Sequence, residues 1–278
     1  MKKLLFITAI AFVTFLSSCS DDSNSESDID LVEELDVEAE STLESNYEDI
    51  DSIVEAGLES VETGGRIIRD AILDCASVTH DEDAKTITID YGDGCVGPGG
   101  RTRAGIISIT YTDHRLVPGA SRTAVFDGFS LDGVQIEGAR TVENISASID
   151  DDPTFSISLI GGMMTFEDGT TATRESTRTR TWHRGDNPIN DEASVEGNAN
   201  GVGREGNSYS MEILTRIVYK RACWSSGVFI PVSGIKQYTS GDNVAIIDYG
   251  DGTCDNEVTI TINGGEPFTK VINPRGSR

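Results

Sequence analysis

The sequence predicts an all-β body that follows one acidic, amphipathic helix. Beyond Asp74, apolar and polar residues alternate in short runs, and turn residues recur about every eight to twelve positions, as in antiparallel β proteins. Across residues 31–65, apolar residues instead recur every three or four positions, as they do on one face of a helix. The change of period therefore divides the chain into a helix and a single β domain, residues 66–278.

Twelve segments carry the alternating pattern of strands. They are residues 76–79, 85–91, 104–111, 122–131, 134–148, 155–160, 163–166, 170–183, 209–219, 228–238, 244–249 and 258–262. Strands joined by short links usually pair with their sequence neighbours, which predicts an antiparallel meander. A sheet of this width must roll up, and a sandwich, an open half-barrel and a trough all fit the pattern. Residues 187–207 are rich in Gly, Asn, Asp and Glu, so we expect a loop or a weak edge there.

The acidic helix carries one apolar stripe. Its members are Leu31, Leu35, Ala39, Leu43, Tyr47, Ile50, Val54, Leu58 and Val61. The paired glycines Gly64 and Gly65 then supply a stop signal. The stripe packs either on the β body or on another helix. We favour the body, because repulsion among the like charges on the other face makes a free helix marginal.

The N-terminus has the pattern of a lipoprotein signal peptide. Lys2 and Lys3 precede an apolar run, residues 4–16, that is too short to span a bilayer permanently. Leu16-Ser17-Ser18-Cys19 is similar to the lipobox of bacterial lipoproteins, in which the new terminal cysteine receives acyl chains such as palmitate. We therefore expect residues 1–18 to be removed and Cys19 to be held in a membrane. The alternative is an ordinary secretory signal with an incidental cysteine.

The residues after the signal predict a disordered acidic spacer, residues 19–30. Ser20-Asp21-Asp22-Ser23 is similar to the tag that directs Bacteroidota lipoproteins to the outer face of the outer membrane. The formal net charge is −25, and residues 21–62 hold seventeen carboxylates without one Lys or Arg. This charge argues against nucleic acid as a partner and against simple attraction to anionic lipid headgroups. We expect a lipid-anchored outer-membrane protein that faces the exterior.

The cysteine count fits an exported chain. Five cysteines less the lipidated Cys19 leave four, and an even remainder in an oxidising compartment argues for disulfides. Three pairings are possible, and we favour the two local bridges, Cys75 with Cys95 and Cys223 with Cys254. Loops of about 20 and 30 residues would each contribute roughly 3 to 4 kcal/mol in the chain-entropy model. Zinc is a weaker interpretation, because neither CxxC spacing nor paired histidines accompany these cysteines.

A repeated motif brackets the β body. Asp90-Tyr91-Gly92-Asp93-Gly94-Cys95 returns as Asp248-Tyr249-Gly250-Asp251-Gly252-Thr253-Cys254, each time after an apolar alternating run. The aspartates could offer oxygen ligands to calcium, but their spacing does not match an EF-hand loop. We favour a tight turn in which Asp-Gly supplies the positive φ and the tyrosine packs at the strand end.

One strand carries the candidate ligand-binding residues. Arg174, Arg178, Arg180 and Trp182 share one parity of residues 170–183, so they lie on one face of the strand. Guanidinium groups clamp oxyanions and aromatic rings stack on sugars, which points to an acidic or sulfated glycan. The competing interpretation is cross-strand pairing with acidic residues on a solvated sheet face. The acidic residues available for it are Glu137, Glu143 and Glu212.

Catalysis finds little support in the sequence. The three histidines, His80, His114 and His183, are scattered, and neither a Gly-x-Ser-x-Gly, an HExxH nor a Walker motif occurs. Paired carboxylates carry no information in a chain this acidic. The sequence therefore predicts no catalytic residue, no metal site and no cofactor.

Three motifs of the chain resemble those of a known protein family. Thr86–Cys95, Glu137–Thr141 and Asp248–Asn256 together look like a family of Bacteroidota outer-membrane lipoproteins with repeated DYGDG-Cys modules. The resemblance covers nearly all of the mature body and implies an outer-membrane address and a β-rich shape. It implies neither an activity nor site residues.

The sequence is consistent with three functions. The favoured one is a non-enzymatic surface lipoprotein that binds a glycan, a protein or an envelope component. The second is a structural accessory subunit of an outer-membrane complex, with the stripe of residues 35–61 as its docking helix. The third is an all-β hydrolase whose site has no recognisable motif.

Overall fold

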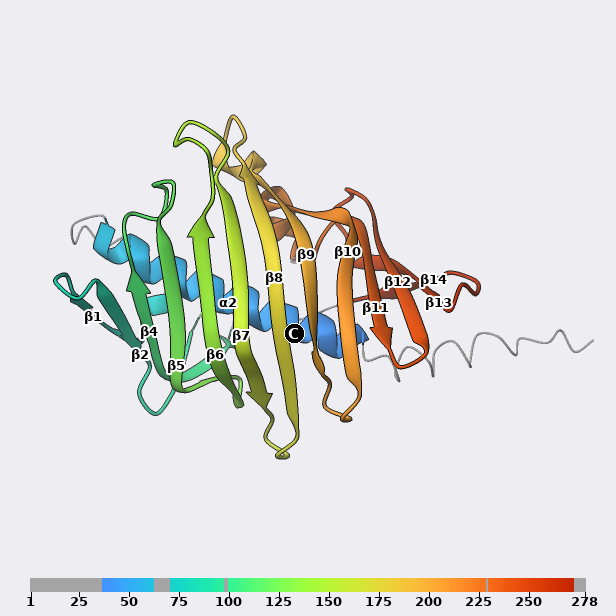
Figure 1. Ribbon diagram of the computed structural model, residues 1–278, viewed down its shortest axis with the longest axis horizontal. Coiled ribbons are helices and arrows are strands. Elements are labelled where there is room, and N and C mark those ends of the chain that lie inside the picture. The colour runs from blue at the N-terminus through green and yellow to red at the C-terminus, as the bar shows by residue number, and fades with distance from the viewer. Residues whose placement is uncertain (1–36, 63–70, 98–99, 229, 273–278) are drawn as a thin grey trace, which may run out of the picture.

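The strands form one open antiparallel sheet, with helix α2 (Val37–Glu62) lying across one of its faces (Figure 1). The computed structural model describes residues 37–62, 71–97, 100–228 and 230–272. The expected signal peptide (1–18), the expected lipidation site Cys19, the expected spacer (19–30) and the first residues of the expected helix lie outside the described residues. The predicted all-β class with one N-terminal helix is confirmed.

The sheet is an antiparallel meander, as predicted, and it has fourteen strands where the sequence predicted twelve. The strands are β1 (Ser77–Asp81), β2 (Thr86–Asp90), β3 (Cys95–Val96), β4 (Thr102–Tyr111), β5 (Ser121–Leu131), β6 (Val134–Asn144), β7 (Thr154–Thr165), β8 (Thr171–His183), β9 (Glu192–Val202), β10 (Ser208–Lys220), β11 (Ser233–Ser240), β12 (Asn243–Asp251), β13 (Glu257–Ile262) and β14 (Phe268–Val271). Each pairs with its sequence neighbours, except that β3 pairs with β4 beside the main path. Three short 3₁₀ turns complete the described elements: η1 (Ala71–Leu73), η3 (Pro188–Asn190) and η4 (Arg221–Ser226). A single open sheet rules out the two-sheet sandwich.

The loop or weak edge expected at residues 187–207 is wrong, because β9 is a central strand between β8 and β10. Small residues are needed there, since neighbouring backbone approaches closely. A Cβ on Gly197 would overlap the carbonyl of Thr177, and one on Gly201 would overlap the carbonyl of Thr173. The glycine-rich composition suggested a loop, but glycine is needed here because the neighbouring strands pack too closely for a side chain.

Other strand boundaries also differ from the prediction: the segment expected at 134–148 ends at Asn144, and the one expected at 228–238 becomes a strand only from Ser233. The segments expected at 155–160 and 163–166 form one strand, β7, which passes through a register shift between Leu159 and Gly162. β14 carries only four residues and was not predicted. A short edge strand limits the unpaired backbone that an open sheet exposes.

Bulges marked by glycine bend the sheet. The β4–β5 register shifts between Ala104 and Ile106, and the β6–β7 register shifts between Glu137 and Ala139. The skipped residues Gly105 and Gly138 have φ of 79° and 117°. Such bulges increase the local twist and bend the strand, which lets the sheet curve around α2.

Replacing Gly105 with alanine is expected to lower the free energy of unfolding by roughly 2 kcal/mol or more. A left-handed alanine costs about 1–2 kcal/mol, and its Cβ would also overlap the Gly128 carbonyl on β5. Chemical denaturation measures the loss. The control is Gly119→Ala, which has φ of 83° but no described atom within 4 Å of its Cβ. Equal losses in the two variants would contradict the role of close strand approach.

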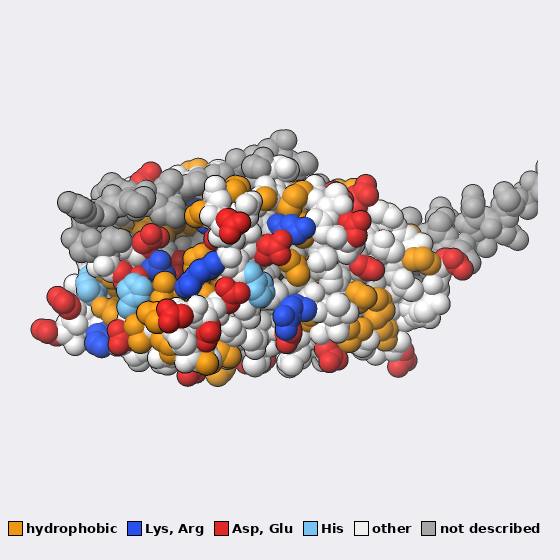
Figure 2. Space-filling model, turned by 90° about the horizontal axis from the view of Figure 1, so that it is seen from above, with side chains coloured by type: hydrophobic (Ala, Val, Ile, Leu, Met, Phe, Trp, Pro, Cys, Tyr) orange, Lys and Arg blue, Asp and Glu red, His pale blue; other side chains and the backbone are white. Residues whose placement is uncertain are grey.

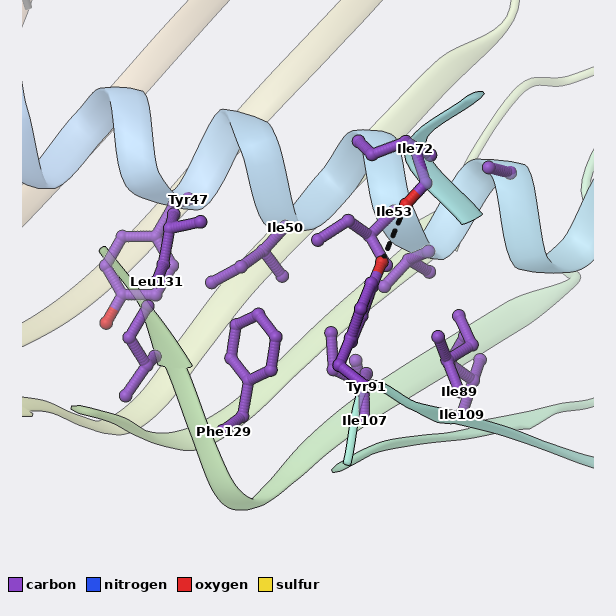
Figure 3. Close-up of a cluster of buried hydrophobic side chains, with 14 of the residues drawn as sticks. Tyr47, Ile50, Ile53, Ile72, Ile89, Tyr91, Ile107, Ile109, Phe129 and Leu131 are labelled. Atoms are coloured by element: carbon purple, nitrogen blue, oxygen red, sulfur yellow. Dashed lines mark hydrogen bonds between the residues drawn. The ribbon is translucent and has the colours of Figure 1, made fainter. Parts of the chain in front are cut away.

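Helix α2 packs on the β body, as favoured from the sequence. Ile50, Ile53 and Leu58 of the helix are fully buried against sheet residues, among them Ile89 and Phe129 (Figure 3). Fully burying one such side chain contributes about 1.5–3 kcal/mol. The C-terminal strands have a separate cluster around Tyr238, Ile247 and Ile260, without helix residues among the described side chains. The apolar contacts of the helix therefore lie within the cluster of the first half of the sheet.

Both local disulfides are present, Cys75–Cys95 and Cys223–Cys254, as predicted. The first DYGDG motif is a turn that follows β2, as predicted, whereas the second lies largely inside β12, where the pairing with β11 shifts register between Asp248 and Asp251. The Asp90 carboxylate accepts from the Gly92 N–H at 2.7 Å, and the Asp248 carboxylate accepts from the Gly250 N–H at 2.9 Å. Tyr91 is buried, and its hydroxyl donates to the Ile72 carbonyl at 3.1 Å (Figure 3). Because β2 and β12 end at opposite ends of the sheet, the two bridged turns lie far apart.

Candidate functional site

The acidic side chains of α2 meet a cationic face of the sheet. The pairs are Glu44 with Arg178 and Lys236, Glu48 with Arg180, Asp49 with Arg103, Asp51 with Arg140, Glu55 with Arg115 and Arg122, and Glu62 with Arg115. These cations come from β4, β5, β6, β8 and β11 and from the segment after β4. The helix therefore contacts the sheet through ion pairs as well as through apolar burial.

The arginines of β8 belong to this interface. Arg178 is only 7% exposed and donates to the Glu44 carboxylate at 2.9 Å, while Arg180 donates to Glu48 at 2.9 Å. Arg174 is buried and donates to the Tyr209 hydroxyl at 3.4 Å. The expected pairing with Glu137, Glu143 and Glu212 is replaced by pairing with the helix. A ligand could reach Arg178 only by displacing α2.

Glu44 is the most heavily engaged helix carboxylate among the described residues. Its Oε1 accepts from Arg178 and from the Tyr219 hydroxyl at 3.0 Å, and its Oε2 accepts from Lys236. Burial alone would raise the pKa of Glu44, but the charges of Arg178 and Lys236 outweigh burial and hold it well below its usual value. Burial raises the pKa of Tyr219 well above its usual value, so the phenol stays a donor. The cluster is therefore ionised and closed at neutral pH.

The two ends of the sheet differ in the length of their connections. Long segments join the strands at one end, here called the loop end: residues 112–120, 145–153, 184–191 and 221–232. At the other end, β5–β6 and β11–β12 are joined by the pairs 132–133 and 241–242. Binding residues concentrate on loops that a rigid scaffold positions. Figure 2 looks onto the loop end, where charged, histidine and hydrophobic side chains lie intermixed.

Trp182 is the one sequence-predicted candidate that lies at the loop end. It stands near the end of β8, and the Arg184 guanidinium lies 5.9 Å from its ring centroid. Arg184 is exposed. The structure thus separates Trp182 from Arg174, Arg178 and Arg180, whose face is covered by α2.

The loop end also carries the second tryptophan, which sequence reasoning missed. Trp224 lies in η4 and is 49% exposed, with the Arg221 guanidinium 5.9 Å from its ring centroid. The Arg221 N–H donates to the Asp191 carbonyl at 3.0 Å, which joins this loop to residues 184–191. Trp182, near the end of β8, and Trp224, in the segment after β10, therefore both lie at the loop end, each with an arginine beside its ring. In the sequence, each tryptophan has an arginine two or three positions away, and this shared spacing could have indicated the second arginine–tryptophan contact.

All three histidines gather at the loop end as well, although they are scattered in the sequence. His80 lies 2.7 Å from the Tyr111 hydroxyl, and His114 lies 3.2 Å from the Glu62 carboxylate. His183 ends β8. A meander brings alternate connections to the same end, so residues far apart in sequence meet there.

His183 bridges an aspartate and a serine. Its Nδ1 lies 3.0 Å from Asp152 Oδ2, and its Nε2 lies 2.9 Å from Ser194 Oγ. Because a carboxylate only accepts, Nδ1 carries the proton and Nε2 of the neutral ring accepts from the serine hydroxyl. The hydrogen bond from His183 lowers the pKa of Asp152, so that carboxylate is ionised at neutral pH. No sequence motif predicted this chain of hydrogen bonds, which joins three separate segments.

Metal binding has no support among the described residues, where His, Cys, Asp and Glu form no group of three that could hold an ion. A pocket of about 160 Å³ lies beside the second DYGDG turn and is lined in part by Asp248, Asp251 and Glu257. The Asp251 carboxylate is already used by Thr253, whose N–H and hydroxyl both donate to it. These carboxylates serve local turn geometry.

Comparison of the chain with protein-family models, with curated proteins and with solved structures finds no match in any of the three. Within the part of the chain that the structure describes, no helix is both long and apolar enough to cross a bilayer.

Proposed function

We propose that the protein is a lipid-anchored, outward-facing outer-membrane lipoprotein whose loop end binds an anionic glycan. The signal pattern, the Cys19 lipobox and the acidic tag support the address. The two disulfides support export, because such bridges persist in oxidising compartments. The accessory-subunit alternative loses its main support, since α2 from Leu43 to Leu58 buries its stripe in the protein's own core.

The observation that supports a glycan ligand is the pair of arginine–tryptophan contacts at the loop end, one at the end of β8 and one in η4. A tryptophan ring offers a broad apolar face to the C–H face of a sugar. A guanidinium beside it can bind sulfate or carboxylate oxygens in a bidentate manner. Trp182 with Arg184 and Trp224 with Arg221 combine these two contacts at two points, which suits a chain of several sugar units.

Because α2 covers the arginines on one face of the sheet, the loop end is favoured as the binding surface. Arg103 and Arg178, which would otherwise attract an anion, are 1% and 7% exposed and already face helix carboxylates. Arg184 and Arg221 are instead exposed. Arg184 and Arg221 are therefore open to an anionic ligand, whereas the arginines under α2 are not.

Replacing Trp224 with alanine is expected to weaken binding to sulfated or uronate polysaccharides about tenfold, because one stacking contact contributes roughly 1 to 1.5 kcal/mol. The double variant Arg184→Ser, Arg221→Ser should lose binding and its dependence on salt. Affinity electrophoresis of the purified chain in anionic and neutral polysaccharides measures both effects. Binding of the same polysaccharide to intact cells that express the full chain tests the outward orientation.

The matched control is Arg204→Ser. Arg204 also lies over an aromatic ring, 3.9 Å from the Phe166 centroid, and also pairs with an aspartate, Asp168, but it stands at the opposite end of the sheet. Its variant should bind like the wild type. Binding that survives loss of both loop-end arginines and Trp224 would refute the proposal, as would equal losses in the control.

A further inference from the structure

We infer that Asp152, His183 and Ser194 form a nucleophilic centre that hydrolyses small acyl esters at the loop end. This activity does not rest on glycan binding and uses none of the side chains proposed for it. It belongs to a different class of function from a binding module.

The geometry matches the hydrogen-bond order of a serine hydrolase relay. Ser194 Oγ lies 2.9 Å from His183 Nε2, and Nδ1 on the far side of the ring lies 3.0 Å from Asp152 Oδ2. A nucleophile within hydrogen-bond reach of a base, with the base oriented by a carboxylate, is the arrangement that activates serine. The Asp152–His183 contact selects the tautomer that leaves Nε2 free to take the serine proton.

The scaffold holds these groups in place. His183 and Ser194 belong to paired strands, since His183 is opposite Glu192 and Ser194 is opposite Thr181. Asp152 comes from the loop before β7, and the Trp182 N–H donates to the Pro153 carbonyl at 2.8 Å, which fixes that loop beside β8. The Arg184 N–H also approaches Asp152 Oδ1 at 3.4 Å. Sites carried by paired strands keep their geometry better than sites on free loops.

The reaction would follow the usual two steps of acyl transfer. Ser194 Oγ attacks the ester carbonyl and passes its proton to His183 Nε2. The C–O bond to the alcohol breaks as the imidazolium returns that proton to the leaving oxygen. Water then attacks the acyl-serine, giving its proton to His183, and the acid leaves as Ser194 regains its hydrogen. Asp152 stays ionised and stabilises the imidazolium, so it is a positioning residue.

Exposure restricts the substrate. Ser194 is only 4% exposed, whereas the side chains of His183 and Asp152 are 41% and 46% exposed. The acyl group must therefore reach past the imidazole to a recessed hydroxyl, while the alcohol part can remain in solvent. This favours a short acyl group, such as acetyl, on an alcohol of any size.

The test uses the purified chain with both disulfides intact, p-nitrophenyl acetate as substrate and a small fluorophosphonate as a serine probe. We expect probe attachment at Ser194, found by peptide mapping, and steady ester hydrolysis above buffer. Ser194→Ala should abolish attachment, and His183→Asn should lower the hydrolysis rate by about a hundredfold or more. Asp152→Asn should lower kcat with KM little changed, and Asp152→Glu should restore part of it.

The control variant is Ser156→Ala, on the neighbouring strand β7 and outside the relay, which should keep the wild-type rate and label. Circular dichroism of each variant separates loss of folding from loss of chemistry. An unlabelled Ser194 in the folded wild type, or a Ser194→Ala variant that hydrolyses the ester at the wild-type rate, would overturn the inference. In either case the glycan experiment keeps its own outcome, because it changes different residues.

Discussion

Replacing Glu44 with glutamine is expected to lower the free energy of unfolding by about 3 to 5 kcal/mol, the largest effect of any single change considered. Glutamine keeps the shape of the side chain but removes the charge that Arg178 and Lys236 face inside the protein. Both cations are buried and cannot recover their hydration, so their desolvation remains uncompensated. Urea or guanidinium denaturation at neutral pH measures the loss.

The control is Glu212→Gln on β10, which removes one carboxylate from the exposed outer face of the same sheet. It should change stability by less than about 0.5 kcal/mol, as surface substitutions usually do. A Glu44→Gln variant as stable as this control would mean that apolar burial alone holds α2.

The same carboxylate makes the protein sensitive to acid. The reference pKa of a glutamate side chain is 4.5. In the folded protein burial would raise the pKa of Glu44, but the charges of Arg178 and Lys236 outweigh burial and hold it well below that value. A lowered folded pKa gives stability that is complete above the unfolded pKa and is lost as the pH falls through the folded one. Asp51 shifts in the same direction, because Arg140 outweighs its burial. Glu44→Gln should therefore lose less stability on acidification than the wild type.

Removing the disulfide Cys223–Cys254 by a double substitution to alanine is expected to cost roughly 3 to 4 kcal/mol, because the bridge limits the unfolded chain. Its cysteines are 31 positions apart, against 20 for Cys75–Cys95, and the logarithmic dependence on loop length makes the entropic difference between the two bridges only a few tenths of a kcal/mol. Cys223 is also buried in the C-terminal cluster, so its loss should exceed that of the first bridge. Denaturation of each double variant measures both values.

Reduction of the wild type with a strong thiol reductant provides the comparison for the disulfide variants. It should reproduce the combined loss without changing any side-chain packing apart from the sulfurs. If the Cys223→Ala, Cys254→Ala variant were as stable as the oxidised wild type, the bridge would have no role in holding the C-terminal strands.

Local patterns predicted the features that depend on local physics. Alternating polarity identified most of the strands, though not β9 or β14, short links predicted the meander, and two cysteines beside each DYGDG motif predicted the local bridges. The three-to-four residue period predicted the helix and its apolar contact with the sheet. Each of these follows from residues close together in the chain.

Sequence patterns led to wrong predictions where a residue contacts another residue that is far away in the chain. The glycines of β9 look like loop signals, but the backbone of β8 requires them. The arginines of β8 look like a free anion site, but a helix more than one hundred residues earlier neutralises them. The local sequence of either segment does not indicate which distant segment packs against it.

The sequence by itself determined the class of fold, the disulfides and the expectation of a lipid-anchored exported chain, because periodicity, cysteine parity and the signal pattern are local properties. Only the tertiary structure decided which cations are covered and which surface is open, because the meander collects alternate connections at one end while the sheet bends around α2. It also brought Asp152, His183 and Ser194 together from three segments. The physical reason is that charge pairing and hydrogen bonding depend on distance in space, and chain folding alone sets that distance.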